Sequence, residues 1–180
     1  MPSLRGVIDR RILVNFRIDA DAATAVLPTP FEPRTVDGDA IGGICLLRLT
    51  DVRPRGLPAA VGVRSENAAH RIGVHWDDDG RRRDGLPESS VFDSVEAASA
   101  YHRRGATGFS PSPDGTRFAG IELDTFEWSV TPLSVESVGA SYFESDRFPA
   151  DAVTFDNALL MEGIDHEWHS VEGICPSAPS

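Results

Sequence analysis

The sequence has no lysine, and all 17 of its basic residues are arginine. Enzymes that form an imine with a ketone use a desolvated lysine amine as the nucleophile. The composition therefore excludes lysine-dependent Schiff-base chemistry.

Cysteines and long apolar runs are also scarce. Of the two cysteines, Cys45 falls in an apolar segment, where a buried free thiol is the ordinary expectation, and Cys175 falls in a tail rich in proline and serine. Nothing in this spacing demands a disulfide. The longest apolar run, residues 40–47, has only the length of a strand. Because no secretory-type apolar segment follows the arginines of residues 1–11, we expect a cytoplasmic protein.

Positive charge is in deficit, since 28 carboxylates outweigh the arginines and leave a net charge of −11. Such a surface repels nucleic acid and anionic membranes, so neither is an expected partner. A GC-rich genome would explain the missing lysine but not the acidic excess. A salt-rich cytosol explains both, because salt screens the repulsion between surface carboxylates. We therefore favour a halophilic origin as a hypothesis.

What remains is typical of one globular domain that is mostly β. Residues 11–18 alternate in the strand period of two, and Asp19 can cap a short helix over residues 22–27. Val36-Asp37-Gly38-Asp39 is a hairpin turn signal. The other predicted strands are residues 40–50, 64–76, 118–130, 133–143 and 152–162.

Loops, a turn and a second helix are predicted between and after these strands. Residues 51–62 are predicted to be a loop, residues 77–80 a turn, and residues 81–85 a solvated charged link. Residues 94–104 form the best helix candidate, capped by Asp93 and stopped by Gly105. We expect a single domain over residues 1–172 and a disordered tail over residues 173–180.

The densest group of chemically useful side chains is residues 64–71. On a strand, Arg64, Glu66 and His70 share one face. Together in a cavity, they could bind a carboxylate and move a proton, and we assign them as candidate catalytic residues. The alternative is a row of ion pairs on a solvent-exposed face.

A second group is Asp165-His166-Glu167-Trp168-His169. The histidines are three residues apart, so on a strand they face opposite sides and cannot share a metal ion. No metal site or other cofactor is therefore expected. Glu167 and His169 can instead form a carboxylate–imidazole pair on one face. No nucleophile elbow and no phosphate-binding glycine loop occurs.

Motifs over most of the chain resemble the YqjF-like family of uncharacterised proteins. They are Asn15-Phe16-Arg17, Val36-Asp37-Gly38, residues 43–49, Arg53-Pro54-Arg55-Gly56-Leu57-Pro58, residues 64–71, residues 155–161 and His166-Glu167-Trp168-His169. That family is similar to the acetoacetate-decarboxylase-like superfamily. The resemblance implies an antiparallel β-barrel or cone with one or two short helices around an internal cavity. It also implies that Arg64 and Glu66 match an arginine–glutamate pair lining that cavity.

Two departures from the family matter. The imine-forming lysine is absent, and only residues 81–85 join Gly80 to Leu86, where family members carry additional strand-forming sequence. The barrel is thus expected to be incomplete, with either an open cavity or a shortened form of the fold. Unpaired strand edges could then pair with a second copy.

Two functions follow as hypotheses. The first is binding of, or non-imine chemistry on, a small ligand that bears a carboxylate or carbonyl group. In this hypothesis, the candidate ligand contacts besides the catalytic group are Asn15, Arg17, Asn67, Glu167 and His169. The second is a non-catalytic ligand carrier or a protein-interaction domain that acts through exposed strand edges.

Overall fold

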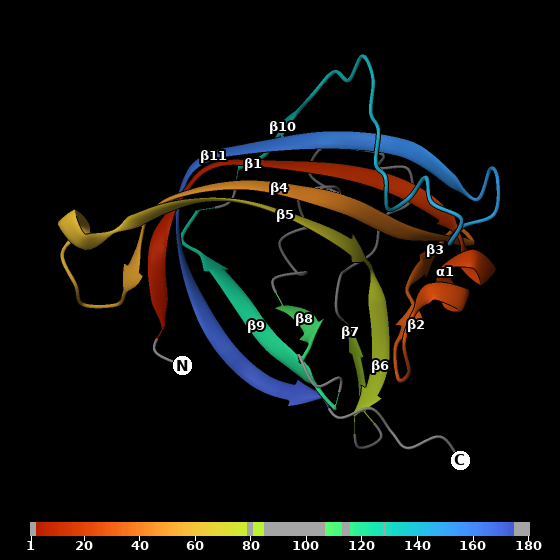
Figure 1. The fold of residues 1–180 in the computed structure, drawn as a ribbon, viewed down its shortest axis with the longest axis horizontal. Coiled ribbons are helices and arrows are strands. Elements are labelled where there is room, and N and C mark those ends of the chain that lie inside the picture. Colours follow the sequence, from red (N-terminus) through yellow and green to blue (C-terminus); the bar gives the residue numbers. More distant parts are fainter. Residues whose placement is uncertain (1–2, 79–80, 85–106, 113–115, 128, 175–180) are drawn as a thin grey trace.

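The protein folds into antiparallel strands with one α-helix among the described residues, as seen in a computed structural model (Figure 1). The structure describes residues 3–78, 81–84, 107–112, 116–127 and 129–174. The elements are β1 (Leu4–Asp19), α1 (Ala20–Val26), β2 (Glu32–Pro33), β3 (Thr35–Val36), β4 (Asp39–Pro54), η1 (Ala59–Val61), β5 (Val63–Ile72), β6 (Val74–Asp78), β7 (Arg81–Asp84), β8 (Thr107–Pro111), β9 (Phe118–Thr125), β10 (Thr131–Pro132) and β11 (Val153–Ile174). The expected mostly-β fold class is confirmed.

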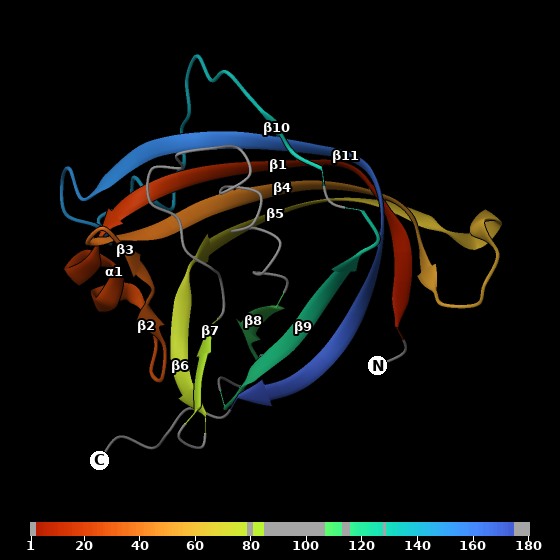
Figure 2. The ribbon, with the colours of Figure 1, turned by 180° about the vertical axis from the view of Figure 1, so that it is seen from behind.

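Three long strands form an arch. The main sheet has the order β3-β4-β1-β11-β9-β8, with β5 beside β4 and β10 beside β11. A small sheet has the order β2-β6-β7. Because β5 runs into β6 through Gly73, the small sheet continues one end of the arch, and β8 with β9 forms the other end (Figures 1 and 2).

The described strands do not close into a barrel, in line with the expectation of an incomplete one. The two sheets share no strand pairing among the described residues. Aromatic side chains bridge the gap instead. Phe31, which precedes β2, and Trp76 of β6 both pack against Phe109 of β8, with ring centroids 6.1 Å and 5.1 Å apart. We call this contact the aromatic seam.

Both faces of the arch are buried, so the core has two parts. Leu13, Cys45 and Met161 belong to the concave part, whereas Val14, Phe16 and Ile18 belong to the convex part. Strand β1 therefore buries consecutive residues. This double burial explains why its sequence has apolar side chains at both odd and even positions.

The convex part is covered by residues 133–152, where a strand over residues 133–143 was expected. That expectation is wrong, because the segment consists mainly of bends and turns after β10. It still buries Ala140, Phe143 and Phe148 against Phe16 and its neighbours. The apolar residues that suggested a strand are thus anchors of an irregular cover.

Local signals located the first helix and hairpin correctly. Asp19 accepts a hydrogen bond from the backbone N–H of Ala22 at 2.9 Å, so it caps α1 as expected. Asp37 and Gly38 both have positive φ, 48° and 96°, in the turn that joins β3 to β4. Positive φ at both central residues is the requirement of the tightest hairpin turn.

Other boundaries shift. Residues 81–84, expected to be a solvated link, form strand β7 paired with β6. Strand β11 continues through Gly173 to Ile174, which pairs with Phe118, so the strand runs into the expected tail. The helix expected over residues 94–104 lies outside the described residues. Within the described part of the chain, no helix is long and apolar enough to cross a membrane.

Candidate functional site

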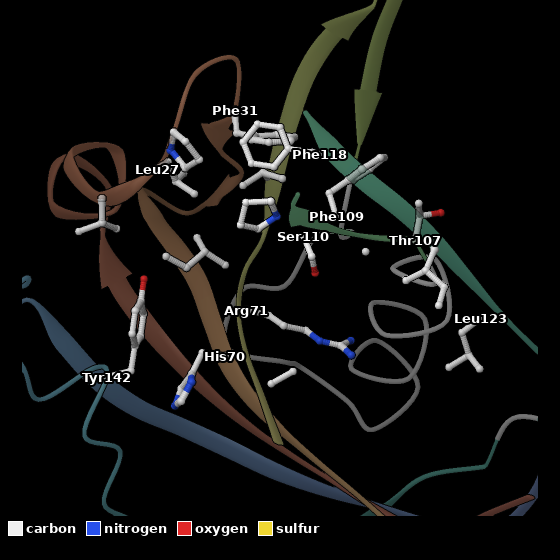
Figure 3. A pocket seen from close by; sticks show the side chains of 18 of the residues that line it. Leu27, Phe31, His70, Arg71, Thr107, Phe109, Ser110, Phe118, Leu123 and Tyr142 are labelled. Atoms are coloured by element: carbon white, nitrogen blue, oxygen red, sulfur yellow. The ribbon is translucent and has the colours of Figure 1, made fainter. Parts of the chain in front are cut away.

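A cavity of about 530 Å³ lies beneath the arch. This volume is within the range that holds a small organic molecule. The chain between α1 and β2, the end of β5, and strands β8 and β9 contribute most of its wall, and Phe31, Phe109 and Phe118 gather at one end (Figure 3). Most of the described lining side chains are apolar, and none is a carboxylate.

Arg71 of β5 is the most unusual lining residue. Its side chain extends into the middle of the cavity (Figure 3). Burial lowers the pKa of Arg71, and the positive charge of Arg11 lowers it further, against the opposite influence of Cys45. A guanidinium still stays charged. No hydrogen bond or ion pair joins the half-buried Arg71 to another described residue, so within the described part of the chain its donors point into the cavity without an acidic partner.

Arg11 of β1 adds a second guanidinium to the wall. It is buried, and its Nε atom donates to the Cys45 sulfur at 3.2 Å. Its Nη1 atom lies 3.9 Å from the Met161 sulfur. The described wall thus contains two guanidinium groups and no carboxylate.

The aromatic end of the cavity is rigidly packed. The Phe31 ring meets Phe118 with centroids 4.9 Å apart and Trp76 with centroids 5.7 Å apart, both edge to face. Edge-to-face pairs hold their partners in defined orientations. The seam that joins the two sheets therefore also supplies a preformed apolar surface for a ligand.

His166 lies deeper in the concave part of the fold. Its side chain is fully buried, and neither ring nitrogen has a hydrogen-bond partner. Burial lowers its pKa from 6.5 to about 4. This effect exceeds the opposite effects of the Ile164 backbone and the Asp165 charge, which raise the pKa. The imidazole is therefore neutral at physiological pH, and its ring packs edge-on to Trp168.

Arg64 and Glu66 do not lie where the sequence analysis placed them. Both are exposed, and neither lines the cavity. Glu66 accepts a hydrogen bond from Arg48 Nε at 2.8 Å, with its side chain 71% exposed. This geometry is that of the surface ion pair that was weighed as the alternative. The neighbouring odd positions, Ala69 and Arg71, are the ones that reach the concave side.

His70 and Asn67 complete the expected β5 group. His70 is the one member of the predicted set that lines the cavity. It does so at the rim, where its ring meets Tyr142 with centroids 5.0 Å apart, away from Arg71 (Figure 3). Asn67 is exposed and donates to Ser65.

Asn15 and Arg17 of β1 are occupied within the sheet. Asn15 is buried and donates to Asn157 on the neighbouring strand at 2.8 Å. Arg17 lies 3.7 Å from Asp156 and 3.9 Å from Asp39, in a partly exposed ion-pair group. Both residues tie β1 to neighbouring strands, and neither lines the described cavity.

Glu167 and His169 share a face of β11, as expected, but that face points away from the cavity. Glu167 Oε2 lies 3.7 Å from His169 Nε2 and 3.7 Å from Arg55. His169 also contacts Asp124 at 3.3 Å and Ser3 at 3.0 Å. The group ties the start of β1 to β9 and β11. Within the described ranges, no cluster of side chains could hold a metal ion.

Arg11 and Arg71 were not among the residues predicted to form the site. Arg71 stands in the same motif as Arg64, but the period of two favours neither face when both central residues are small, as Ala68 and Ala69 are. A usable signal was available at Arg11, which begins the alternating apolar segment of residues 11–18. A charged residue in such a position usually serves a purpose beyond packing.

Together these features describe a mostly antiparallel β protein with an open, strongly curved sheet and an apolar cavity whose described wall contains two arginines. No family model matches the sequence, and no curated protein matches it. Among solved structures, the enduracididine biosynthesis enzyme MppR, complexed with the condensation product of pyruvate and imidazole 4-carboxaldehyde, aligns over 97% of this chain and 89% of its own. The identity is 12% and the TM-score 0.34, values too low to define the fold or the activity of this chain.

Proposed function

We propose that the protein binds a small monocarboxylate with an apolar body in the cavity beneath the arch. The observation that carries this proposal is the guanidinium of Arg71, which extends into the cavity with no described acidic partner. Holding a desolvated charge without a partner is costly, and a bound carboxylate would relieve that cost through two parallel hydrogen bonds.

The wall defines the rest of the ligand. Phe31, Phe109 and Phe118 offer a preformed apolar surface, and Thr107 and Ser110 add hydroxyl groups. A single anionic group with an aromatic or branched aliphatic body matches this arrangement. A dianion fits it less well, because Arg11 already contacts Cys45 and Met161.

Binding is favoured over catalysis. The titratable side chains in the described wall are Arg11, His70, Arg71 and Tyr142. His70 and Tyr142 stack against each other at the rim, and Glu66, the expected acid–base partner, faces solvent. Lysine-imine chemistry is excluded by composition. The proposal is therefore a binding protein, either a carrier or a sensor, rather than a decarboxylase.

Calorimetric titration with matched ligands tests the proposal. Phenylacetate should bind, and phenylacetamide, which has the same shape without the charge, should bind at least about tenfold more weakly. Arg71→Gln should remove this preference for the acid. Arg64→Gln is the matched control, since it deletes an exposed arginine of the same strand and should leave affinity unchanged. Equal binding of acid and amide, or loss of binding in Arg64→Gln alone, would overturn the proposal.

A further inference from the structure

Strand β5 lies at the margin of the main sheet and has one edge without a strand partner among the described residues (Figure 1). On its other edge it pairs with β4 in a regular ladder from Ser65 to Ile72, without a bulge. The unpartnered side, which we call the open edge, contains no proline. Bulges and prolines are among the features that keep such an edge from pairing with another chain. The open edge is therefore suited to accept an additional strand.

The hydrogen-bond pattern of the β4–β5 ladder shows which groups lie on the open edge. Gly73 N–H donates to the Ile41 carbonyl at 2.8 Å. In an antiparallel ladder, hydrogen-bonded residue pairs alternate with pairs that make no bond to each other. Odd-numbered residues of β5 therefore bond to β4. The even-numbered residues Glu66, Ala68 and His70 direct their N–H and C=O groups to the open edge.

The cavity reaches this edge. Four consecutive residues of β5, residues 69–72, line it. Successive side chains of a strand point to opposite faces, so the cavity touches both faces of β5. Because β4 occupies the other edge, the cavity passes around the open edge. A ligand held by Arg71 therefore lies beside backbone donors and acceptors of β5.

The open edge ends where β6 begins. Gly73 accepts a hydrogen bond from Arg34 N–H at 2.9 Å, which places β2 on the same side as β4. Strand β7 pairs with the opposite side of β6, from His75 to Asp78, and occupies the continuation of the open edge. A chain that lies along β5 towards β6 must therefore end or turn away near Gly73. A carboxyl terminus is favoured there, because the Arg71 guanidinium attracts a carboxylate and repels an ammonium group.

We propose that the ligand of this cavity is the C-terminal segment of another polypeptide. The segment adds to the open edge as a strand parallel to β5, and its terminal carboxylate lies on Arg71. Its last side chain is apolar and packs at the aromatic end formed by Phe31, Phe109 and Phe118. In such complexes, main-chain hydrogen bonds give affinity and side-chain pockets give specificity. The strand addition rests on the carboxylate site proposed above and defines its class of ligand.

Calorimetric titration with three matched ligands tests this proposal. The ligands are N-acetylphenylalanine, an acetylated pentapeptide of alternating threonine and valine that ends in phenylalanine, and the C-terminal amide of the same pentapeptide. The pentapeptide acid should bind at least about tenfold more tightly than N-acetylphenylalanine, because it adds main-chain hydrogen bonds to the same carboxylate and ring. The amide should bind at least about tenfold more weakly than the acid, since it lacks the charge that Arg71 attracts.

Ala68→Pro tests the open edge on the protein side. It removes a backbone N–H that points to the open edge, and Ala68 is exposed, so the proline ring has space. Pentapeptide affinity should fall at least about fivefold. Binding of N-acetylphenylalanine should not change, which shows that the cavity is intact. Ala68→Ser keeps the N–H and is the control, with pentapeptide affinity equal to that of wild type.

N-methylation of the pentapeptide gives a second measurement that does not depend on how a variant folds. Two adjacent interior amides are methylated one at a time, and only one of the two changes should weaken binding, because alternate N–H groups of a strand face β5. Equal effects of the two methylations, an unchanged pentapeptide affinity in Ala68→Pro, or equal affinities of pentapeptide and N-acetylphenylalanine would overturn strand addition and leave the carboxylate site standing. Failure of every acid to bind would overturn the proposed function itself.

Discussion

At the scale of single residues, the concave side of the fold holds polar groups at a cost. Arg71 is a half-buried cation without a described acidic partner, and His166 is a fully buried imidazole whose ring nitrogens have no hydrogen-bond partner. Groups in such positions reduce stability unless a ligand or function compensates for them. The two residues are therefore tested in different ways. Arg71 is tested by a substitution that removes its charge, and His166 by the pH dependence of stability.

Arg71→Met should stabilise the unliganded protein while abolishing carboxylate binding. The methionine retains the apolar part of the side chain and removes the desolvated charge, so the free energy of unfolding should rise by about 1 kcal/mol or more. Urea unfolding of the unliganded protein measures the change. A clear loss of stability would show that Arg71 has a structural role, in contradiction to the role proposed for it.

His166 should make the fold acid-sensitive. Its pKa is about 4 in the folded state and near 6.5 when unfolded, so above pH 6.5 it is neutral in both states and has no effect on the pH dependence. As pH falls from 6.5 to 4, only the unfolded state takes up the proton, and stability is lost by about 3 kcal/mol in total.

His166→Leu removes this loss. Its stability relative to wild type should therefore increase between pH 7 and pH 4, as followed by chemical unfolding at each pH. His70→Gln, at an exposed histidine, is the control and should retain the acid-induced loss of stability, because His166 is still present. Parallel profiles for wild type and His166→Leu would contradict the buried, neutral state of the ring.

At the scale of elements, close approach between layers decides which glycines are required. Gly42 of β4 faces the convex core, where an added Cβ would collide with the Ile18 side chain and lie 3.0 Å from the Phe143 ring. Gly108 of β8 has open space, with its nearest neighbour at 4.0 Å. Residues 133–152 can thus pack this closely against β4 because position 42 has no side chain.

Gly42→Ala should cost about 1–3 kcal/mol of unfolding free energy, because the packed ring of Phe143 must shift. Gly108→Ala should stay within about 0.5 kcal/mol of wild type. Thermal or urea unfolding of both variants provides the comparison. Equal stabilities would show that the cover is loosely seated.

The strands also show which features sequence periodicity can predict and which it cannot. Alternation in β1, the cap at Asp19 and the turn at Asp37 and Gly38 predicted a strand, a helix and a hairpin close to their observed places, because those signals are local. Periodicity failed for residues 133–143, whose apolar residues anchor an irregular segment. It also failed for Arg64 and Glu66, because their strand has no distinctly apolar face. Which side of β5 faces the cavity depends on strands that are distant in sequence.

At the scale of the whole molecule, the acidic surface should make stability depend on salt. Raising potassium chloride from about 0.1 M to about 2 M screens the repulsion among 28 carboxylates, so the melting temperature should rise across the series. Differential scanning calorimetry measures it. A melting temperature that does not increase towards molar salt would contradict the halophilic hypothesis.

The sequence by itself determined the β-rich class, the exclusion of lysine-imine chemistry, and the acidic surface, because composition and local periodicity do not depend on how the chain is arranged. Tertiary structure alone decided that aromatic rings bridge the two sheets and that Arg71 rather than Arg64 enters the cavity. These outcomes depend on curvature and register between strands far apart in the chain. A shift of one residue in strand register exchanges the solvent-facing and the enclosed side chains of the strand.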